Sequence, residues 1–106
     1  MIADIASHRE ELRDLCRRFH VRRLEVFGSA VRDDFDPAQS DIDFLVEFDP
    51  DAPSANSISG FFDFKEALEA LFGRSVDLVD RKAIENSRNY IRKRHILKGA
   101  EPIYAA

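Results

Sequence analysis

Residues 40–48 read Ser-Asp-Ile-Asp-Phe-Leu-Val-Glu-Phe, and the alternation in this stretch decides which fold the sequence predicts. Successive side chains of a strand point to opposite faces of a sheet. A strand over Asp41–Phe48 therefore has one wholly apolar face, made of Ile42, Phe44, Val46 and Phe48. The other face begins with Asp41 and Asp43. We expect the apolar face to pack on helices and the acidic end to open into a cleft.

The chain before this stretch predicts a strand that ends in a small turn. Arg22–Phe27 alternates as a strand does, and Gly28 and Ser29 then end it. Ser29 is a suitable N-cap for a short helix that continues to about Arg32. The segment 33–40 is polar and contains a proline, which predicts a loop.

Helical and strand patterns alternate along the rest of the chain. The expected elements are a helix over Ile2–Phe19, a helix from about Phe61 to Leu71 with Gly73 after its end, a strand over Val76–Val79, a helix over Ile84–Leu97, and a short edge strand or docked tail at Pro102–Tyr104. Helices that interleave with several short strands predict an α+β (α/β-type) sheet with helices packed on one face. The order of the strands does not follow from this pattern.

Size and composition predict one soluble domain over residues 1–106. A chain of 106 residues with nine Phe has enough apolar material for one core, not for two separate domains. The net charge of −4 gives no broad attraction for nucleic acid or an anionic membrane, and no apolar run is long enough to span a bilayer. Cys16 is the single cysteine, so an intrachain disulfide is excluded and a cytoplasmic location is expected.

Asp41, Asp43 and Asp77 together predict a metal site. The first two stand two residues apart and so point to the same side of a strand, and Asp77 lies in a later strand-like run. Two charges about 4 Å apart repel by about 4 kcal/mol at an effective dielectric constant of about 20, so a convergent cluster needs a cation or a proton. Carboxylates suit Mg²⁺, and two ions about 3.5–4 Å apart would activate a hydroxyl and orient a triphosphate. The plain alternative is a solvated strand edge with an unrelated Asp77.

The turn at Gly28 and Ser29 predicts a phosphate site. Its amides lie near the positive end of a helix dipole, and glycine permits close approach of the backbone. Arg32 follows about one helical turn later, and Ser40 fixes the loop that enters the next strand. The alternatives are a plain turn with an N-cap serine and an exposed surface arginine. The sequence contains neither a Walker-type P-loop nor a Rossmann fingerprint.

In these residues the chain resembles the polymerase-beta-like nucleotidyltransferase superfamily, and in particular its minimal nucleotidyltransferase (MNT, MntA-type antitoxin) branch. The resemblance lies in Val26–Ser29 with Arg32, in Ser40–Val46, in Val76–Val79 and in the ending Ala100–Tyr104. It implies a small mixed β-sheet flanked by helices. It also implies an enzyme that uses ATP and two Mg²⁺ ions to transfer AMP to a hydroxyl, expected to be a tyrosine, of a partner HEPN-domain toxin, which is thereby neutralised.

The resemblance implies a role for each candidate residue: nucleotide binding for Gly28, Ser29, Arg32 and Ser40, and metal binding and catalysis for Asp41, Asp43 and Asp77. The sequence departs from the family pattern at two points in the loop between Ser29 and Asp41. Eleven residues separate Ser29 from Asp41, one more than is common in the family, and Arg32 is followed by Asp33 where the family often has glycine. Neither departure removes a catalytic group.

Two other functions stay open at this stage. A non-catalytic antitoxin would neutralise its partner by complex formation, with Phe61, Phe62 and the basic segment Arg88–Lys98 as its interface. The same basic segment is otherwise a solvated helix face. Nucleotide transfer to a small molecule or an RNA end is the weaker alternative, because the chain has no room for an acceptor-binding domain. Stable nucleic-acid binding is not expected, and homo- or hetero-oligomers are both open.

Overall fold

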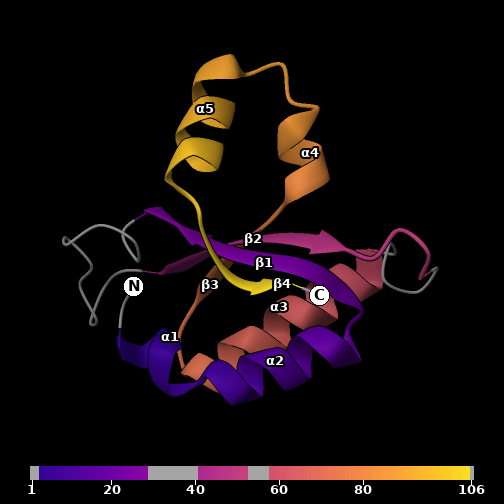
Figure 1. Cartoon of the computed structure of the whole chain (residues 1–106), viewed down its shortest axis with the longest axis vertical. Helices are drawn as coiled ribbons and strands as arrows, with labels where there is room; N and C mark the ends of the chain where they lie inside the picture. Colours follow the sequence, from indigo (N-terminus) through magenta and orange to yellow (C-terminus); the bar gives the residue numbers. More distant parts are fainter. Residues whose placement is uncertain (1–2, 29–40, 53–57, 106) are drawn as a thin grey trace.

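The computed structural model of the chain describes residues 3–28, 41–52 and 58–105. Its elements follow one another as α1 (Ala3–Ser7), α2 (Arg9–Arg18), β1 (Val21–Phe27), β2 (Ile42–Phe48), α3 (Ile58–Phe72), β3 (Val76–Asp80), α4 (Arg81–Glu85), α5 (Tyr90–Gly99) and β4 (Glu101–Ala105). The strands form one sheet in the order β3-β2-β1-β4 (Figure 1). β1 runs antiparallel to β2 and β4, whereas β2 and β3 are parallel. The predicted α+β fold with a small mixed β-sheet flanked by helices is confirmed.

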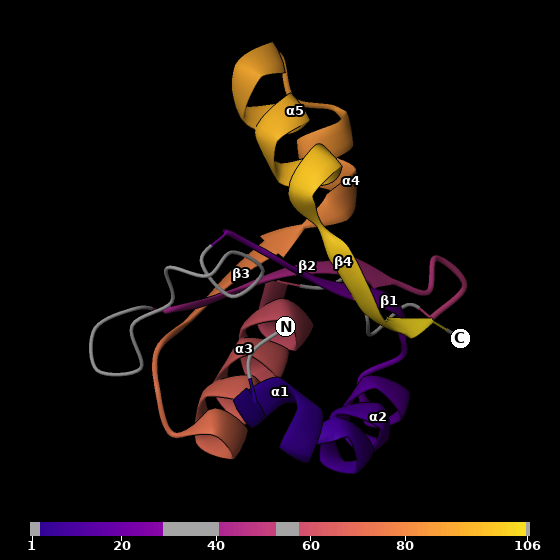
Figure 2. The ribbon, with the colours of Figure 1, turned by 60° about the vertical axis from the view of Figure 1, so that its left-hand side comes forward.

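The main core lies between one face of the sheet and helices α1, α2 and α3 (Figure 2). The residues predicted to share the apolar face of β2 are all buried there, namely Ile42, Phe44, Val46 and Phe48. Phe64 and Leu68, one turn apart on α3, belong to the same core, as do Leu12 and Cys16 of α2. Burial raises the pKa of Cys16 to about 12, so this thiol is a core group and not a reactive one.

The opposite face of the sheet is also covered, which corrects the prediction of helices on one face only. α4 and α5 stand side by side on the side of the sheet away from α1, α2 and α3 (Figures 1 and 2). Leu45 of β2 is 1% exposed and belongs to a second, smaller apolar cluster with Ile84 of α4 and Ile96 of α5. Leu45 interrupts the otherwise polar face of β2, and its burial requires a cover on that side.

Two of the predicted helices are each divided in two. The helix expected over Ile2–Phe19 is broken at His8 into α1 and α2. The helix expected over Ile84–Leu97 is broken at residues 86–89, and its first part begins earlier, at Arg81. In the described part of the chain, no helix is long and apolar enough to cross a membrane.

Capping residues explain where α4 and α5 begin. The backbone N–H of Lys82 donates to Oδ1 of Asp80 at 2.9 Å, and that of Arg92 donates to Oδ1 of Asn89 at 3.2 Å. Each cap satisfies a backbone donor that has no partner in the first turn of a helix. Apolar periodicity alone did not reveal the break, because Ile84 and Ile96 point toward the same small cluster from both helices.

The carboxyl-terminal residues settle the alternative between an edge strand and a docked tail. β4 pairs antiparallel with β1, with Glu101 opposite Val26 and Tyr104 opposite Leu24. Pro102 occupies this strand at the edge of the sheet, where the missing N–H of proline is tolerated. The chain therefore leaves α5 and enters the sheet directly beside the end of β1.

Candidate nucleotidyl-transfer site

Gly28, directly after β1, brings the backbone against a carboxylate. Phe27, the last residue of β1, lies opposite Asp43 in the antiparallel pairing with β2. The backbone of Gly28 has a φ of +68°, a left-handed conformation that residues with a Cβ rarely adopt. A Cβ at this position would overlap Oδ2 of Asp43. Glycine is therefore required here twice, once for the turn and once for the space.

Asp43 and Asp77 lie at the same level on neighbouring strands. They are register partners in the parallel pairing of β2 with β3. Adjacent strands are about 4.8 Å apart and register partners point to the same face, so the two side chains share one end of one face. Charges about 5 Å apart repel by about 3 kcal/mol at an effective dielectric constant of about 20, a repulsion that a cation between them would relieve.

Asp41 stands just before β2 and is exposed. We call the end of the sheet that bears Gly28, Asp41, Asp43 and Asp77 the acidic edge. Among residues 3–28, 41–52 and 58–105, no three carboxylate, imidazole or thiol groups are gathered closely enough to hold a metal ion. The three aspartates thus share an edge without forming a closed ligand set. Their oxygen donors still fit a hard cation such as Mg²⁺, and these are the residues that would hold it.

Three candidate residues lie outside the described residues, namely Ser29, Arg32 and Ser40. Their assignment to nucleotide binding stays a prediction, as does the short helix expected from Ser29. The described residues on either side, Gly28 and Asp41, both belong to the acidic edge.

A buried ion pair joins β1 to α4. Glu25 of β1 is 3% exposed and pairs with Arg81, the first residue of α4. Nε of Arg23 lies 3.3 Å from the same carboxylate, and Nε of Arg81 also donates to Oε1 of Glu85 at 2.9 Å. Two guanidinium groups thus compensate one buried carboxylate, as the burial of a charge requires. The pair holds the start of α4 against the sheet, four residues after Asp77 in the chain.

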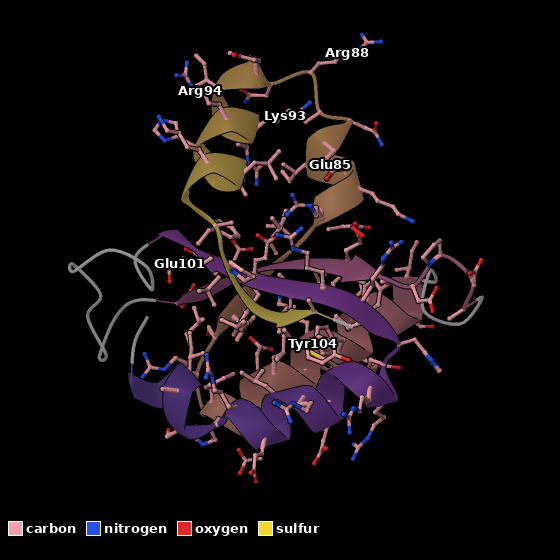
Figure 3. The ribbon with its side chains drawn as sticks, viewed as in Figure 1. Glu85, Arg88, Lys93, Arg94, Glu101 and Tyr104 are labelled. Atoms are coloured by element: carbon pink, nitrogen blue, oxygen red, sulfur yellow. The ribbon has the colours of Figure 1, made fainter. Side chains whose placement is uncertain are left out.

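A groove of about 1030 Å³ lies between α5 and the acidic edge. Phe27 and Gly28 line it from the end of β1. Tyr90, Arg94 and Lys98 line it from α5. Figure 3 shows Arg94 on the side of α5 that faces away from α4. Gly28 lines the groove, and a Cβ at Gly28 would overlap the carboxylate of Asp43, so the groove lies next to the carboxylate site.

Sequence reasoning missed Glu25 and the groove side of α5. The sequence did contain a signal for each. Glu25 is a lone acid between apolar residues of a strand, and Tyr90, Arg94 and Lys98 recur every four residues, which places them on one side of a helix. Neither signal identifies a partner, because the groove forms only when α5 stands beside the end of β1.

Known proteins that are similar to the chain point to one family. Residues 8–98 match a family described as the nucleotidyltransferase domain. A relative from Thermococcus cleftensis, named protein adenylyltransferase MntA, is 40% identical over 82 residues, which are 77% of this chain and 75% of that protein.

Among the solved structures that are similar to the chain are the following two. One, described as a minimal nucleotidyltransferase, has a TM-score of 0.71 and 30% identity and covers 92% of this chain and 91% of its own. The other is a complex of a tri-AMPylated HEPN toxin of Shewanella oneidensis with MNT antitoxin. It matches with a TM-score of 0.62 and 16% identity over 95% of this chain and 72% of that chain, a likeness that shows the fold alone.

Proposed function

The chain belongs to the nucleotidyltransferase domain family, and from that premise we propose that it is a protein adenylyltransferase antitoxin. It transfers AMP from ATP to a hydroxyl, expected to be a tyrosine, of a partner HEPN toxin and so neutralises the toxin. Support for the acceptor comes from the relative named protein adenylyltransferase MntA and from the complex of MNT antitoxin with an AMPylated HEPN toxin. The observation that supports the chemistry is the register pair Asp43 and Asp77 beside the backbone of Gly28.

The reaction exchanges one phosphorus–oxygen bond for another. The acceptor oxygen attacks the α-phosphorus of ATP, and the bond from that phosphorus to the oxygen that bridges to the β-phosphate breaks, so pyrophosphate leaves. Asp77 accepts the proton of the acceptor hydroxyl. Mg²⁺, as two ions held by Asp41, Asp43 and Asp77, would supply positive charge against the triphosphate. The nucleotide is held by the residues of the turn and the strand entry: Gly28, Ser29, Arg32 and Ser40.

A specific observation favours complex formation as a second function. Four large apolar side chains are exposed in the described part of the chain: Ile58, Phe62, Tyr90 and Ile91. Ile58 and Phe62 are one turn apart on α3 and present an apolar strip of the kind that partner proteins bind. A protein that neutralised its toxin by this contact alone would not need the acidic edge.

The test is the intact mass of the HEPN partner after co-expression with this protein or with its variants. We expect added AMP with the wild type and, with Asp43→Asn or Asp77→Asn, a transfer rate lower by at least about 100-fold, the size of loss typical of removing one transition-state stabiliser. Asp63→Asn is the matched control, because it removes an exposed carboxylate from α3 on the far side of the sheet.

The outcomes separate the two functions. AMP on the partner with the wild type and Asp63→Asn but not with the two site variants supports the enzyme. An unmodified partner that is nevertheless neutralised by all four proteins contradicts it and supports complex formation.

A further inference from the structure

The chain contains two tyrosines, which differ in how accessible they are. Tyr90, the first residue of α5, is 69% exposed, and the neighbouring Ile91 is 72% exposed. Tyr104 of β4 is half-buried and packs against the main core. α5 begins at the end that lies farthest from the sheet (Figure 1), so Tyr90 stands at an outer end of the molecule. A second protein molecule therefore reaches Tyr90 much more easily than Tyr104.

The acidic edge of the same molecule is far from Tyr90. Tyr90 lines the groove that extends to Gly28, but it does so from the first turn of α5, whereas Gly99 lines it from the last. From Gly99 to Tyr90 the helix extends for about 13 Å, at about 1.5 Å per residue. Helical side chains also tilt toward the N-terminus, which directs the Tyr90 ring away from Gly99. Reacting atoms must approach within about 3–3.5 Å, so the site of a second copy suits Tyr90 better than its own.

The residues around Tyr90 are strongly basic. We call residues 88–94 the basic tip, because this segment contains four cationic side chains: Arg88, Arg92, Lys93 and Arg94. No acidic residue occurs between Glu85 and Glu101. Figure 3 shows Arg88, Lys93 and Arg94 on α5 and on the segment just before it, away from the sheet. The basic tip is thus opposite in charge to the acidic edge, to which the proposed function also assigns a triphosphate.

Charge complementarity favours contact between the basic tip of one copy and the acidic edge of another. Attraction of this kind steers association and acts over a screening length of about 10 Å at 0.1 M salt. Two basic tips repel each other, so a symmetric contact between the tips of two copies is disfavoured. The favoured encounter presents Tyr90 of one molecule to the aspartates of the other.

We propose that Tyr90 is a self-modification site, to which one copy of the protein transfers AMP from ATP bound by a second copy. The proposal rests on the proposed function, because it uses the same chemistry on another acceptor. The Tyr90 oxygen attacks the α-phosphorus, the bond from that phosphorus to the oxygen that bridges to the β-phosphate breaks, and pyrophosphate leaves. The hydroxyl proton passes to Asp77 of the copy that holds ATP. The product is an anionic phosphodiester, and Arg94, four residues along α5, is placed to pair with it.

The first test incubates the purified protein alone with ATP and Mg²⁺ and measures its intact mass, followed by peptide mapping. The wild type should gain the mass of one adenylyl group, located on Tyr90. Tyr90→Phe should gain none. Tyr104→Phe is the matched control, because it removes the hydroxyl of the other tyrosine, and it should be modified as the wild type is. A wild-type level of modification in Tyr90→Phe would overturn the proposal.

Mixing two variants tests transfer between copies. Asp43→Asn lacks a site aspartate but keeps Tyr90, whereas Tyr90→Phe keeps the site and lacks the acceptor. In the mixture only Asp43→Asn should gain AMP, at a rate that rises with the concentration of Tyr90→Phe. An unmodified Asp43→Asn, together with a modified wild type whose rate does not change on dilution, would place the transfer within one molecule and overturn the proposal.

Arg92→Glu and Arg13→Glu test the role of the basic tip. Each replaces an exposed arginine and changes the net charge by the same amount, but Arg13 lies on α2, on the other side of the sheet. Arg92→Glu should slow transfer to Tyr90 and Arg13→Glu should not, because only the first reverses a charge of the tip. Equal rates in the two variants would overturn the proposed approach of the tip to the acidic edge.

A parallel reaction with the HEPN partner separates this proposal from the proposed function. AMP on the partner, with none on the protein incubated alone, would overturn Tyr90 as an acceptor and leave the transferase assignment in place. AMP on Tyr90, with none on the partner, would support self-modification and contradict the assignment of the HEPN acceptor. AMP on neither protein would overturn both.

Discussion

Gly28 is the residue at which the conformation of the backbone and the geometry of the site depend on each other. Its backbone φ is +68°. One other described glycine, Gly73 after α3, has a similar left-handed φ of +65°. A Cβ at Gly73 would meet nothing within 4 Å, whereas a Cβ at Gly28 would overlap the carboxylate of Asp43. A side chain at either position would thus adopt an unfavourable left-handed backbone conformation, but only a side chain at Gly28 would also overlap a neighbouring group.

Gly28→Ala and Gly73→Ala therefore form a matched pair. Both should lower the free energy of unfolding by about 1–2 kcal/mol, the cost of a left-handed conformation for a residue with a Cβ. Only Gly28→Ala should also reduce AMP transfer, by about tenfold or more, because Asp43 must move. Urea denaturation and the rate of transfer measure the two effects. Equal transfer rates in the two variants would show that the contact with Asp43 has no role in the site.

Cys16 connects burial to pH dependence. Its pKa rises from an ordinary value of 9.0 to about 12 on folding, so between these pH values the unfolded chain binds fewer protons than the folded one. The free energy of unfolding therefore falls as pH rises through this window, by about 1.4 kcal/mol at about pH 10 on account of this group. Cys16→Ala should lose that part of the pH dependence. Urea denaturation near pH 7.5 and near pH 10 checks it, and an identical pH effect in both proteins would contradict it.

At the scale of elements, α4 is attached to the sheet by charge as well as by apolar contact. Arg81→Ala should lower the free energy of unfolding by about 1–3 kcal/mol, because the buried carboxylate of Glu25 would lose one of its two guanidinium partners. Arg23 remains and keeps the loss from being larger. Glu85→Ala removes only the exposed partner of Arg81 and should cost about 0.5 kcal/mol or less. Chemical denaturation of both variants is the measurement, and equal losses would mean that the buried pair adds no stability.

At the scale of the whole molecule, the sheet separates a large core from a small one. The large core lies against α1, α2 and α3, whereas Leu45, Ile84 and Ile96 are the buried residues of the small cluster under α4 and α5. Fewer buried contacts give a lower free energy of local opening. We therefore expect α4 and α5 to open without unfolding the rest of the molecule.

Ile96→Ala should expose this difference. Ile96→Ala should increase the hydrogen exchange of amides in α4 and α5. Leu68→Ala, in the large core, should instead lower the free energy of global unfolding by about 2–5 kcal/mol. The local opening of α4 and α5 should stay as in the wild type. Hydrogen exchange followed by mass spectrometry resolves the two regions. Increased exchange of β1 and β2 to the same extent as α5 in Ile96→Ala would show that the molecule opens as one unit.

Some of these features follow from local patterns alone. The alternation in residues 41–48 predicted the strand, its buried apolar face and the aspartates at its start, and these are where the structure places them. Val76–Val79 was predicted as a strand for the same reason. The break at residues 86–89 was not predicted, because two helices that face one small cluster keep a continuous apolar period.

The sequence by itself determined the first three strands, the apolar face of β2 and the identity of the acidic residues, because each depends on neighbours within a few positions of the chain. Only the tertiary structure decided that Asp77 stands beside Asp43, that Arg81 compensates Glu25, and that α5 faces Gly28 across a groove. Each of these depends on strand order and on the direction of a crossover. Strand order and crossover direction are set by how apolar faces from distant parts of the chain pack together. The local sequence pattern does not specify that packing.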